Sequence, residues 1–225
     1  MMNKKAEEFV AMLDSVAINP RDTIAEVDYL AECAKKYHYH IVYVNQSFTE
    51  YMINKLRGTD VLVGGTVGNC TGVGEEPLEF KVAAARHWID LGCGEIDMFL
   101  NVPFLRSGMY DEVKKELKAV RDVTPTLLKV IIHTSLLTDE QIRIASELVV
   151  ETGCDFVKTG TGFYGPTTIE AVQVIKDTIG NRAQIKAAGG VNGWEMIEQL
   201  KAIGVTRFGM SNSKVVPLIE ELNAQ

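Results

Sequence analysis

Short apolar runs, rich in β-branched residues, recur along the chain, and each is followed by a turn rich in Gly or Thr and then by an amphipathic segment. Runs of this length between turn residues are typical of buried strands. The clearest lie at residues 40–44, 61–67, 95–101, 127–133, 156–161, 184–190 and 207–211. A weaker run at residues 16–18 predicts one further strand before them.

The segments between these runs carry apolar residues three and four positions apart, the spacing of amphipathic helices. Clear examples lie at residues 78–92, 110–122 and 138–152, and a helix over residues 3–13 precedes the first strand. Thr138 with Gln141 three residues later predicts a capping box. Several helices are expected to end in a left-handed glycine, at Gly153, Gly180 and Gly204.

Strands that alternate with helices imply parallel βαβ units in one sheet, and eight such units close into a barrel. An open doubly wound sheet would more often carry a G-x-G-x-x-G turn after its first strand. The Gly-rich stretch here, GGTVGNCTGVG, follows the third strand and has a different spacing. The pattern therefore predicts an α/β protein, a (β/α)₈ TIM barrel with an extra N-terminal helix, as a single domain over residues 1–225.

The chain has a net charge of -7, which disfavours nucleic acid as a partner but permits a small anionic ligand. No apolar run reaches the ~18–20 residues of a membrane span, so no membrane association is expected. The four cysteines, Cys33, Cys70, Cys93 and Cys154, include no close pair. Reduced thiols and an N-terminus unlike a signal peptide favour a cytoplasmic protein.

Four charged residues interrupt the apolar runs, about 30 residues apart, which is roughly the length of one βα unit. They are Asp97, Lys129, Lys158 and Lys186. Each lysine by itself could point outward and reach solvent, or the set could form a structural ion-pair cluster. Because buried ammonium groups are costly, charges in register on neighbouring strands favour a functional site at the carboxyl ends of the strands.

Lysine attacks a carbonyl only as the neutral amine, and its ordinary pKa is about 10.4. A second ammonium about 5 Å away, at an effective dielectric constant near 20, costs about 3 kcal/mol, or about two pKa units. Partial desolvation lowers the pKa in the same direction. Two lysines beside a carboxylate therefore indicate Schiff-base chemistry with an acid/base partner. Spacing alone leaves open whether Lys158 or Lys186 is the nucleophile.

Gly-bearing segments at residues 160–162, 189–191 and 209–213 follow the last three predicted strands. Barrels of this class commonly bind phosphate there, through backbone N–H groups and a helix N-terminus. Ser211 and Ser213 are expected to donate hydroxyl hydrogen bonds or to cap the last helix. The alternative is that these glycines only form tight turns.

Other polar residues receive smaller roles. His133 and Asn101 end predicted strands at the catalytic side, as candidate ligand contacts or plain rim residues. His38 and His40 alternate as zinc ligands could, but no Cys or Glu cluster accompanies them. We therefore predict no metal site and no cofactor.

The motifs EIDMFLN, LLKVIIHT, FVKTGTGF, IKAAGGV and RFGMS, in this order over about residues 9–220, resemble the deoxyribose-phosphate aldolase family. The resemblance implies a (β/α)₈ barrel that reversibly cleaves 2-deoxyribose 5-phosphate into acetaldehyde and glyceraldehyde 3-phosphate, a reaction of deoxyribonucleotide catabolism. It implies that Lys158 forms the Schiff base, that Lys186 lowers its pKa, and that Asp97 relays protons through water. Lys129 would hold Asp97 and the substrate, and Asp14 and Thr159 would contact the substrate. The phosphate would lie among Gly162, Gly189, Gly190, Gly209 and Ser211.

The chain departs from the family pattern where substrate contacts are expected. Family members usually have Lys-Thr-Ser-Thr-Gly where this chain has Lys-Thr-Gly-Thr-Gly at residues 158–162. The family's Phe-Pro-x-Gly turn after the third strand is replaced here by Gly-Asn-Cys-Thr-Gly at residues 68–72. Where the family has Asp-x-Thr near the first strand, this chain has Asp-Ser-Val at residues 14–16. Where the family has a second serine after the last strand, this chain has Asn212. A related lyase acting on another phosphorylated sugar, or a non-catalytic sugar-phosphate-binding barrel, are the alternatives. A homo-oligomer, dimer or tetramer, is expected from base rates.

Overall fold

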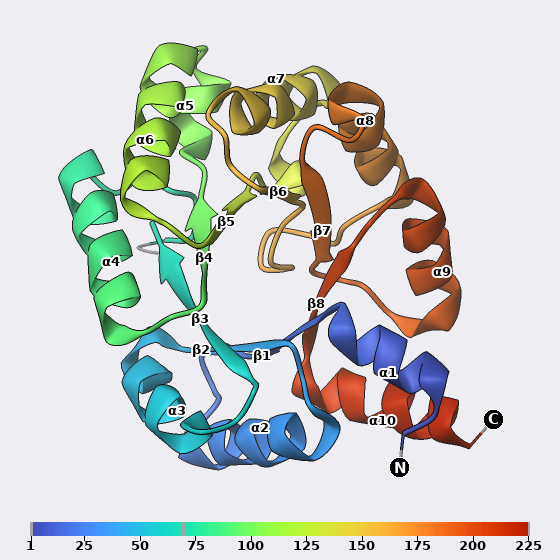
Figure 1. Cartoon of the computed structure of the whole chain (residues 1–225). Coiled ribbons are helices and arrows are strands. Elements are labelled where there is room, and N and C mark those ends of the chain that lie inside the picture. Colours follow the sequence, from blue (N-terminus) through green and yellow to red (C-terminus); the bar gives the residue numbers. More distant parts are fainter. Residues whose placement is uncertain (1, 69–70, 225) are drawn as a thin grey trace.

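In the computed structural model, which describes residues 2–68 and 71–224, eight parallel strands close into a barrel in the order β1 to β8 (Figure 1). This arrangement confirms the predicted (β/α)₈ barrel. The strands are β1 (Leu13–Ala17), β2 (Ile41–Val44), β3 (Leu62–Val67), β4 (Glu95–Phe99), β5 (Leu127–Ile131), β6 (Phe156–Lys158), β7 (Gln184–Ala188) and β8 (Arg207–Ser211).

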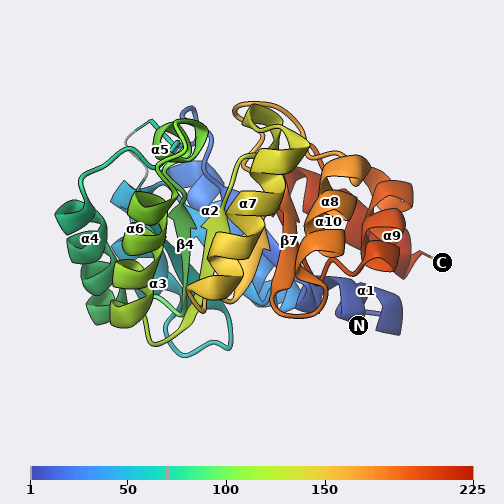
Figure 2. The same cartoon turned by 90° about the horizontal axis from the view of Figure 1, so that it is seen from above.

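Helices surround the barrel on the outside (Figures 1 and 2). They are α1 (Lys4–Ala11), α2 (Ile24–Tyr37), α3 (Thr49–Leu56), α4 (Leu78–Leu91), α5 (Val102–Arg106), α6 (Tyr110–Val123), α7 (Asp139–Glu151), α8 (Ile169–Ile179), α9 (Gly193–Ile203) and α10 (Asn212–Asn223). The capping box at Thr138 and Gln141 is confirmed. Gly204 ends α9 in the left-handed conformation, whereas Gly180 has φ 58° and ψ −116°, outside that region.

The first strand differs most from its prediction. It begins at Leu13 rather than at residue 16, because Leu13 and Asp14 pair with Phe208 and Gly209 of β8. The extra N-terminal helix is confirmed as α1, which lies beside α10, and the two chain ends are close together (Figures 1 and 2). The Asn3 backbone N–H donates to Asn223 Oδ1 at 2.8 Å and ties these ends to each other.

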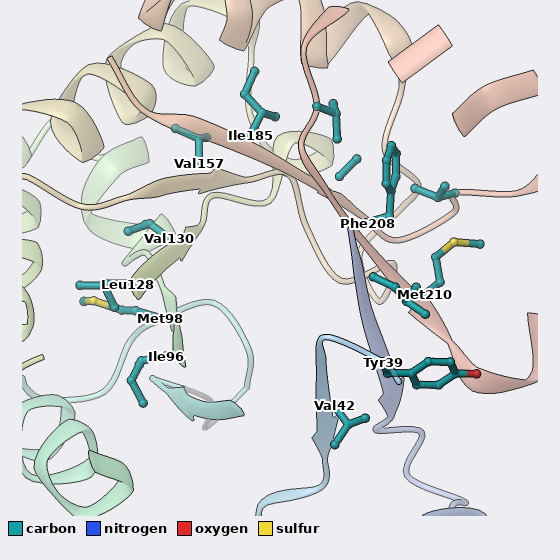
Figure 3. Close-up of a cluster of buried hydrophobic side chains, with 14 of the residues drawn as sticks. Tyr39, Val42, Ile96, Met98, Leu128, Val130, Val157, Ile185, Phe208 and Met210 are labelled. Atoms are coloured by element: carbon teal, nitrogen blue, oxygen red, sulfur yellow. The ribbon is translucent and has the colours of Figure 1, made fainter. Parts of the chain in front are cut away.

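The apolar core lies between the strands and the surrounding helices. Side chains alternate across a strand, so Ile96 and Met98 of β4 face the helices while Glu95 and Asp97 face the barrel interior. Figure 3 shows the outward set, which includes Val42, Ile96, Met98, Leu128, Val130, Val157, Ile185, Phe208 and Met210. Burial of each such side chain contributes about 1.5–3 kcal/mol. This outer layer leaves the barrel interior available for polar groups.

Two observations bear on the predicted surroundings of the protein. Among the described residues, every helix is too short or too polar to cross a membrane. Cys33, Cys93 and Cys154 are buried free thiols, and Cys70 lies outside the described residues. Burial raises the pKa of the Cys93 thiol to about 12, which makes it a poor nucleophile.

Candidate active site

Asp97, Lys129, Lys158 and Lys186 meet inside the barrel, as the strand spacing predicts. The strand register aligns Asp97 with Lys129, and Lys158 with Lys186. All four side chains are buried, and Lys158 is the most exposed of them at 8%. Because the register places the side chains at similar depths on adjacent strands, their polar ends converge on one point of the interior.

Asp97 lies at this point of convergence. Its Oδ2 accepts hydrogen bonds from Lys158 Nζ at 2.7 Å and from Lys186 Nζ at 2.8 Å. Its Oδ1 accepts a hydrogen bond from the Tyr43 hydroxyl at 2.8 Å. Burial by itself would raise the pKa of Asp97, but the adjacent lysines hold that pKa well below its usual range. Asp97 is therefore a charged carboxylate that connects the two amines.

Lys158 stands at the end of β6, where its side chain lines a small cavity of about 70 Å³ together with Asp97 and Phe99. Burial is the largest cause that lowers the pKa of Lys158; Asp97 raises it, Lys186 lowers it further, and the result is about 8. The direction agrees with the sequence prediction, although burial rather than the second ammonium makes the larger contribution. A pKa of 8 leaves about one-tenth of the amine neutral at pH 7.

Lys186 occupies a deeper position than Lys158. It is 1% exposed and pairs with Asp14 Oδ2 at 2.5 Å as well as with Asp97. Its side chain lines neither this cavity nor the larger one described below. The structure thus separates two lysines that spacing alone left equivalent: a substrate in the cavity can reach Lys158 but not Lys186.

A further layer of charges lies beneath Asp97, and sequence analysis missed part of it. Lys129 Nζ bonds to Asp14 Oδ2 and to the Tyr43 hydroxyl, both at 2.9 Å, and to Glu95. Arg207 bridges Asp14 at 3.0 Å and Glu95 at 3.2 Å. Burial opposes the charge on Lys129, but the three carboxylates around it raise its pKa above the usual value. Lys129 is therefore a permanent cation.

The pattern along the strands could have revealed these missed residues. Glu95 stands two positions before Asp97 in β4, so both side chains point inward. Arg207 is the first residue of β8, two positions before Gly209. Tyr43 stands in an apolar run and has the appearance of an ordinary core residue.

The network in the described residues has a nearly balanced charge. Its acids are Asp14, Glu95 and Asp97, and its bases are Lys129, Lys158, Lys186 and Arg207. With all groups ionised the cations exceed the anions by one, and with Lys158 neutral the two are equal. Unpaired buried charge is strongly unfavourable, so the balance favours loss of a proton from the lysine at the cavity wall.

The other predicted substrate contacts are placed at varying distances from the cavities. Asp14 and Lys129 are fully buried behind Asp97 and line neither cavity, although Lys129 Nζ lies 3.5 Å from Asp97 Oδ1. The Thr159 hydroxyl is also buried; it bonds to the Thr167 hydroxyl at 2.7 Å and accepts from the Ala188 N–H at 3.0 Å, which joins β6 to β7.

His133 and Asn101 are buried parts of the loops around the site. His133 has a left-handed backbone (φ 54°), donates from Nε2 to the Gly72 carbonyl at 2.7 Å, and stacks on Phe99. Burial lowers the pKa of His133 to about 4, so the ring is neutral. Asn101 caps α5 by accepting from the Phe104 N–H at 3.1 Å and donates to Glu116 at 3.2 Å, and it lines neither cavity.

A second cavity, of about 400 Å³, lies at the carboxyl ends of β1, β7 and β8. Of the predicted phosphate-binding residues, Gly189, Gly190, Gly209 and Ser211 line this cavity. Gly162 does not line it but packs directly behind: a Cβ at Gly189 would lie 2.3 Å from the Gly162 nitrogen. Gly189 also has φ 88°, which disfavours any other residue.

Helix α10 begins at the wall of this second cavity. Ser211 precedes the helix but makes no side-chain cap, contrary to one of the predicted alternatives, and its hydroxyl lies 3.3 Å from that of Ser213. The free N–H groups and the partial positive charge of the helix start favour an anion here, beside Lys214. The two cavities share Val16, Ile18, Thr161 and Phe163 as lining residues. A short chain with an anionic end can therefore extend from one cavity into the other.

The two histidines considered as zinc ligands each pair with a carboxylate, and one of these carboxylates belongs to the charge network. His38 pairs with Asp60 and His40 with Glu95, both at ring nitrogens. In residues 2–68 and 71–224, no three His, Cys, Asp or Glu side chains are grouped as a metal site requires. Of the departing turn at residues 68–72, Asn69 and Cys70 lie outside the described residues.

Comparisons with known proteins identify relatives over nearly the whole chain, although no family model matches it. Deoxyribose-phosphate aldolase of Mycoplasma mobile is 36% identical over 220 residues, covering 97% of this chain and 100% of the relative. That of Staphylococcus carnosus is 37% identical and covers 91% and 93%. The chain belongs to the deoxyribose-phosphate aldolase family. Membership of the deoxyribose-phosphate aldolase family makes it an enzyme, a carbon–carbon lyase.

Solved structures agree with the deoxyribose-phosphate aldolase assignment. A putative deoxyribose-phosphate aldolase from Coccidioides immitis superposes with a TM-score of 0.89 at 29% identity, covering 98% of this chain and 87% of that one. The enzyme described as "QR15, an Aldolase" gives 0.86 at 29% identity, with 95% of each chain covered. A tetrameric deoxyribose phosphate aldolase from Aeropyrum pernix, at 22% identity and a TM-score of 0.83, shows the shared fold.

Proposed function

We propose that this chain is a class I aldolase that reversibly cleaves 2-deoxy-D-ribose 5-phosphate into acetaldehyde and glyceraldehyde 3-phosphate through a Schiff base on Lys158. One observation carries the proposal. Lys158 faces a cavity, has a pKa of about 8, and shares the carboxylate oxygen of Asp97 with a second lysine. A barrel that only binds sugar phosphates gains nothing from this costly buried arrangement.

The first steps follow from the protonation states. The neutral Lys158 amine attacks the C1 aldehyde of the open-chain sugar, and the resulting carbinolamine loses water to form an iminium ion. Asp97, charged and hydrogen-bonded to Lys158, is placed to accept a proton from the amine during attack. Lys186, on the same oxygen, holds a proton that can be returned to the departing hydroxyl through Asp97 or a water molecule.

Carbon–carbon cleavage uses the iminium as an electron sink. Removal of the proton from the C3 hydroxyl, by Asp97 through a water molecule, turns C3 into the aldehyde of glyceraldehyde 3-phosphate. The electrons of the C2–C3 bond move to the iminium and give an enamine, which is protonated at C2. Hydrolysis then releases acetaldehyde and regenerates the Lys158 amine.

The second cavity provides the place for the phosphate in this proposal. Its wall combines Gly189, Gly190 and Gly209 with Ser211 and the start of α10. Asp22 and Glu26 also line this cavity, but each already accepts a local hydrogen bond: Asp22 from the Asn19 N–H, and Glu26 from Thr23. These bonds stabilise the two carboxylates in place and reduce their repulsion of an anion.

A substrate panel tests this function. Purified protein is incubated with 2-deoxyribose 5-phosphate, ribose 5-phosphate, other phosphorylated aldoses and ketoses, and unphosphorylated 2-deoxyribose, and the aldehyde products are quantified. We expect the largest kcat/KM for 2-deoxyribose 5-phosphate and a strong loss without the phosphate. Preferred cleavage of another sugar phosphate would reassign the substrate, and cleavage of none would contradict the proposal.

We also propose that the chain forms a homo-oligomer. Closed homo-oligomers are common among soluble enzymes, and the structure from Aeropyrum pernix is described as tetrameric. Light scattering coupled to size-exclusion chromatography, at several protein concentrations, distinguishes a dimer or a tetramer from the 24.9 kDa monomer that would contradict this proposal.

A further inference from the structure

Tyr43 of β2 lies inside the charge network rather than in the outer apolar core. It is 4% exposed, and its ring centroid lies 4.6 Å from Lys186 Nζ and 5.3 Å from Lys129 Nζ. Both ammonium groups are close enough for a cation–π interaction with the ring. Its hydroxyl donates to Asp97 Oδ1 at 2.8 Å and accepts from Lys129 Nζ at 2.9 Å. Both the ring and the hydroxyl of Tyr43 therefore contact charged groups.

Gly64 on the neighbouring strand β3 provides the space for this ring. A Cβ atom at Gly64 would lie 2.1 Å from Tyr43 Cε1, far inside the contact distance of two non-bonded carbon atoms. Gly64 does not have a left-handed backbone, so the absence of a side chain, rather than backbone freedom, is what the position requires. Tyr43 and Gly64 thus form a complementary large and small pair.

The two oxygens of Asp97 have different hydrogen-bond donors. Oδ2 accepts from Lys158 and Lys186, whereas Oδ1 accepts from Tyr43. A donor fixed on Oδ1 sets the plane of the carboxylate and directs Oδ2 toward the two amines. A hydrogen bond to the charged form also makes the carboxylate a weaker base. The hydrogen bond from the phenol therefore weakens the stabilisation of the Lys158 ammonium by Asp97, which favours the neutral amine.

We propose that Tyr43 is a positioning residue for the Schiff-base step, which acts by orienting Asp97 and by limiting its attraction for the Lys158 proton. This inference rests on the proposed function. Tyr43 contacts Lys158 only through Asp97, so its effect appears in the proton equilibrium of the amine and in kcat. Tyr43 lines the small cavity beside Lys158 but not the phosphate cavity, and Tyr43→Phe keeps the ring in the small cavity, so KM for the phosphorylated substrate should change little.

Several charged residues surround Asp97 and Lys158 and influence the proton equilibrium of the Lys158 amine. Asp97 is surrounded by Asp14 from β1, Lys129 from β5, Lys158 from β6 and Lys186 from β7. Lys158 faces Asp97, Lys186 and Lys129, and the neutral His133 ring is near it. The substitution Tyr43→Phe leaves each of these ionisable groups in place, but it removes the hydrogen bonds that the hydroxyl makes with Asp97 and Lys129. It removes only the hydroxyl and keeps the ring between the two ammonium groups.

The decisive measurement is the pH dependence of Lys158 acetylation by acetic anhydride, which transfers an acetyl group to the neutral amine and releases acetate, followed by peptide mass spectrometry. This labelling does not require aldolase activity. In Tyr43→Phe we expect the Lys158 midpoint to rise by about half a unit to one unit, the effect of losing one donor to a carboxylate. We expect kcat at pH 7 to fall by about tenfold, as for one hydrogen bond to a charged group.

Two further variants separate the hydroxyl from packing. Tyr43→Val combined with Gly64→Ala removes the ring as well as the hydroxyl and refills only part of the space, and it should still show the upward shift of the midpoint. Tyr39→Phe removes another buried phenol, one that donates to Asn212 instead of Asp97, and it should leave the Lys158 midpoint unchanged. A midpoint in Tyr43→Phe equal to that of the unsubstituted protein overturns the proposal. If the midpoint moves but the unsubstituted protein cleaves no sugar phosphate, the positioning role stands and the proposed function fails.

Discussion

Replacement of Lys186 by methionine should raise the pKa of Lys158. Both amines lie within hydrogen-bond distance of the same Asp97 oxygen, at 2.7 and 2.8 Å, so they are at most about 5.5 Å apart. At an effective dielectric constant near 20, removal of one ammonium at this distance favours the other by about 3 kcal/mol, or about two pKa units.

The consequence can be measured as a pH profile. A rise of two units reduces the neutral fraction of Lys158 at pH 7 from about one-tenth to about one-thousandth. In Lys186→Met, kcat/KM for the retro-aldol reaction at pH 7 should therefore fall by up to about 100-fold. The sign follows from the nucleophile: activity rises with pH through the pKa of Lys158, and the ascending limb moves to higher pH in the variant.

Lys186→Arg is the matched control because it keeps a cation beside Lys158. This variant is expected to lose activity through altered geometry, but its ascending limb should remain near that of the unsubstituted protein. If Lys186→Met loses activity equally at all pH values, with the midpoint unmoved, then electrostatic activation of Lys158 by Lys186 is wrong.

Three other predictions concern the fold that supports the site. Gly189→Ala places a Cβ 2.3 Å from the Gly162 nitrogen at a φ of 88°. We therefore expect a loss of about 1–3 kcal/mol in the free energy of unfolding and an increased KM for the phosphorylated substrate. The control Gly58→Ala, which also has a positive φ but open space around it, should affect stability alone. Lys81→Met leaves the buried carboxylate of Glu116 without the ammonium that lies 2.6 Å away, so we expect the free energy of unfolding, measured in urea, to fall by about 3–5 kcal/mol. Lys81→Met combined with Glu116→Leu should recover most of this lost stability. An unchanged unfolding midpoint in the single variant would show that the ion pair is energetically neutral. The buried Asp14 and Asp97 have pKa values below those of the unfolded chain, so the stability that they contribute is complete above about pH 4 and is lost as the pH falls further. Asp14→Asn should therefore weaken the dependence of the free energy of unfolding on pH between pH 2 and 5. An unaltered dependence on pH would contradict a lowered pKa for Asp14.

The barrel and its central charges could be predicted from the sequence because both depend on local patterns. Alternation with a period of two places Asp97 inside a strand whose neighbours Ile96 and Met98 face the helices. Repetition of βα units brings Lys158 and Lys186 into register. Neither inference requires knowledge of contacts between distant strands.

The remainder of the site depends on contacts across the closed barrel. Lys129 reaches Asp14 from the opposite part of the chain, a contact that exists only after the barrel closes. The difference between Lys158 and Lys186 is one of depth, which spacing along the chain does not encode. Tyr43 was missed because the role proposed for its hydroxyl depends on contacts with Asp97 and Lys129, while its position in the sequence is typical of a core aromatic residue.

Residues at strand ends were the hardest to assign. Asn101 and His133 end predicted strands on the catalytic side, but the backbone turns there and directs Asn101 to cap α5 and His133 to the Gly72 carbonyl. Ser211 was a predicted phosphate contact or helix cap, and its lack of a side-chain cap depends on rotamers that the sequence pattern does not determine.

The most direct measurement of the central claim is reductive trapping with acetaldehyde and sodium borohydride, followed by peptide mapping. If the Lys158 amine is the nucleophile, an ethyl group should appear on Lys158, with simultaneous loss of aldolase activity and no modification of Lys186. Modification of Lys186 instead, or full retention of activity with Lys158 unmodified, would contradict the account.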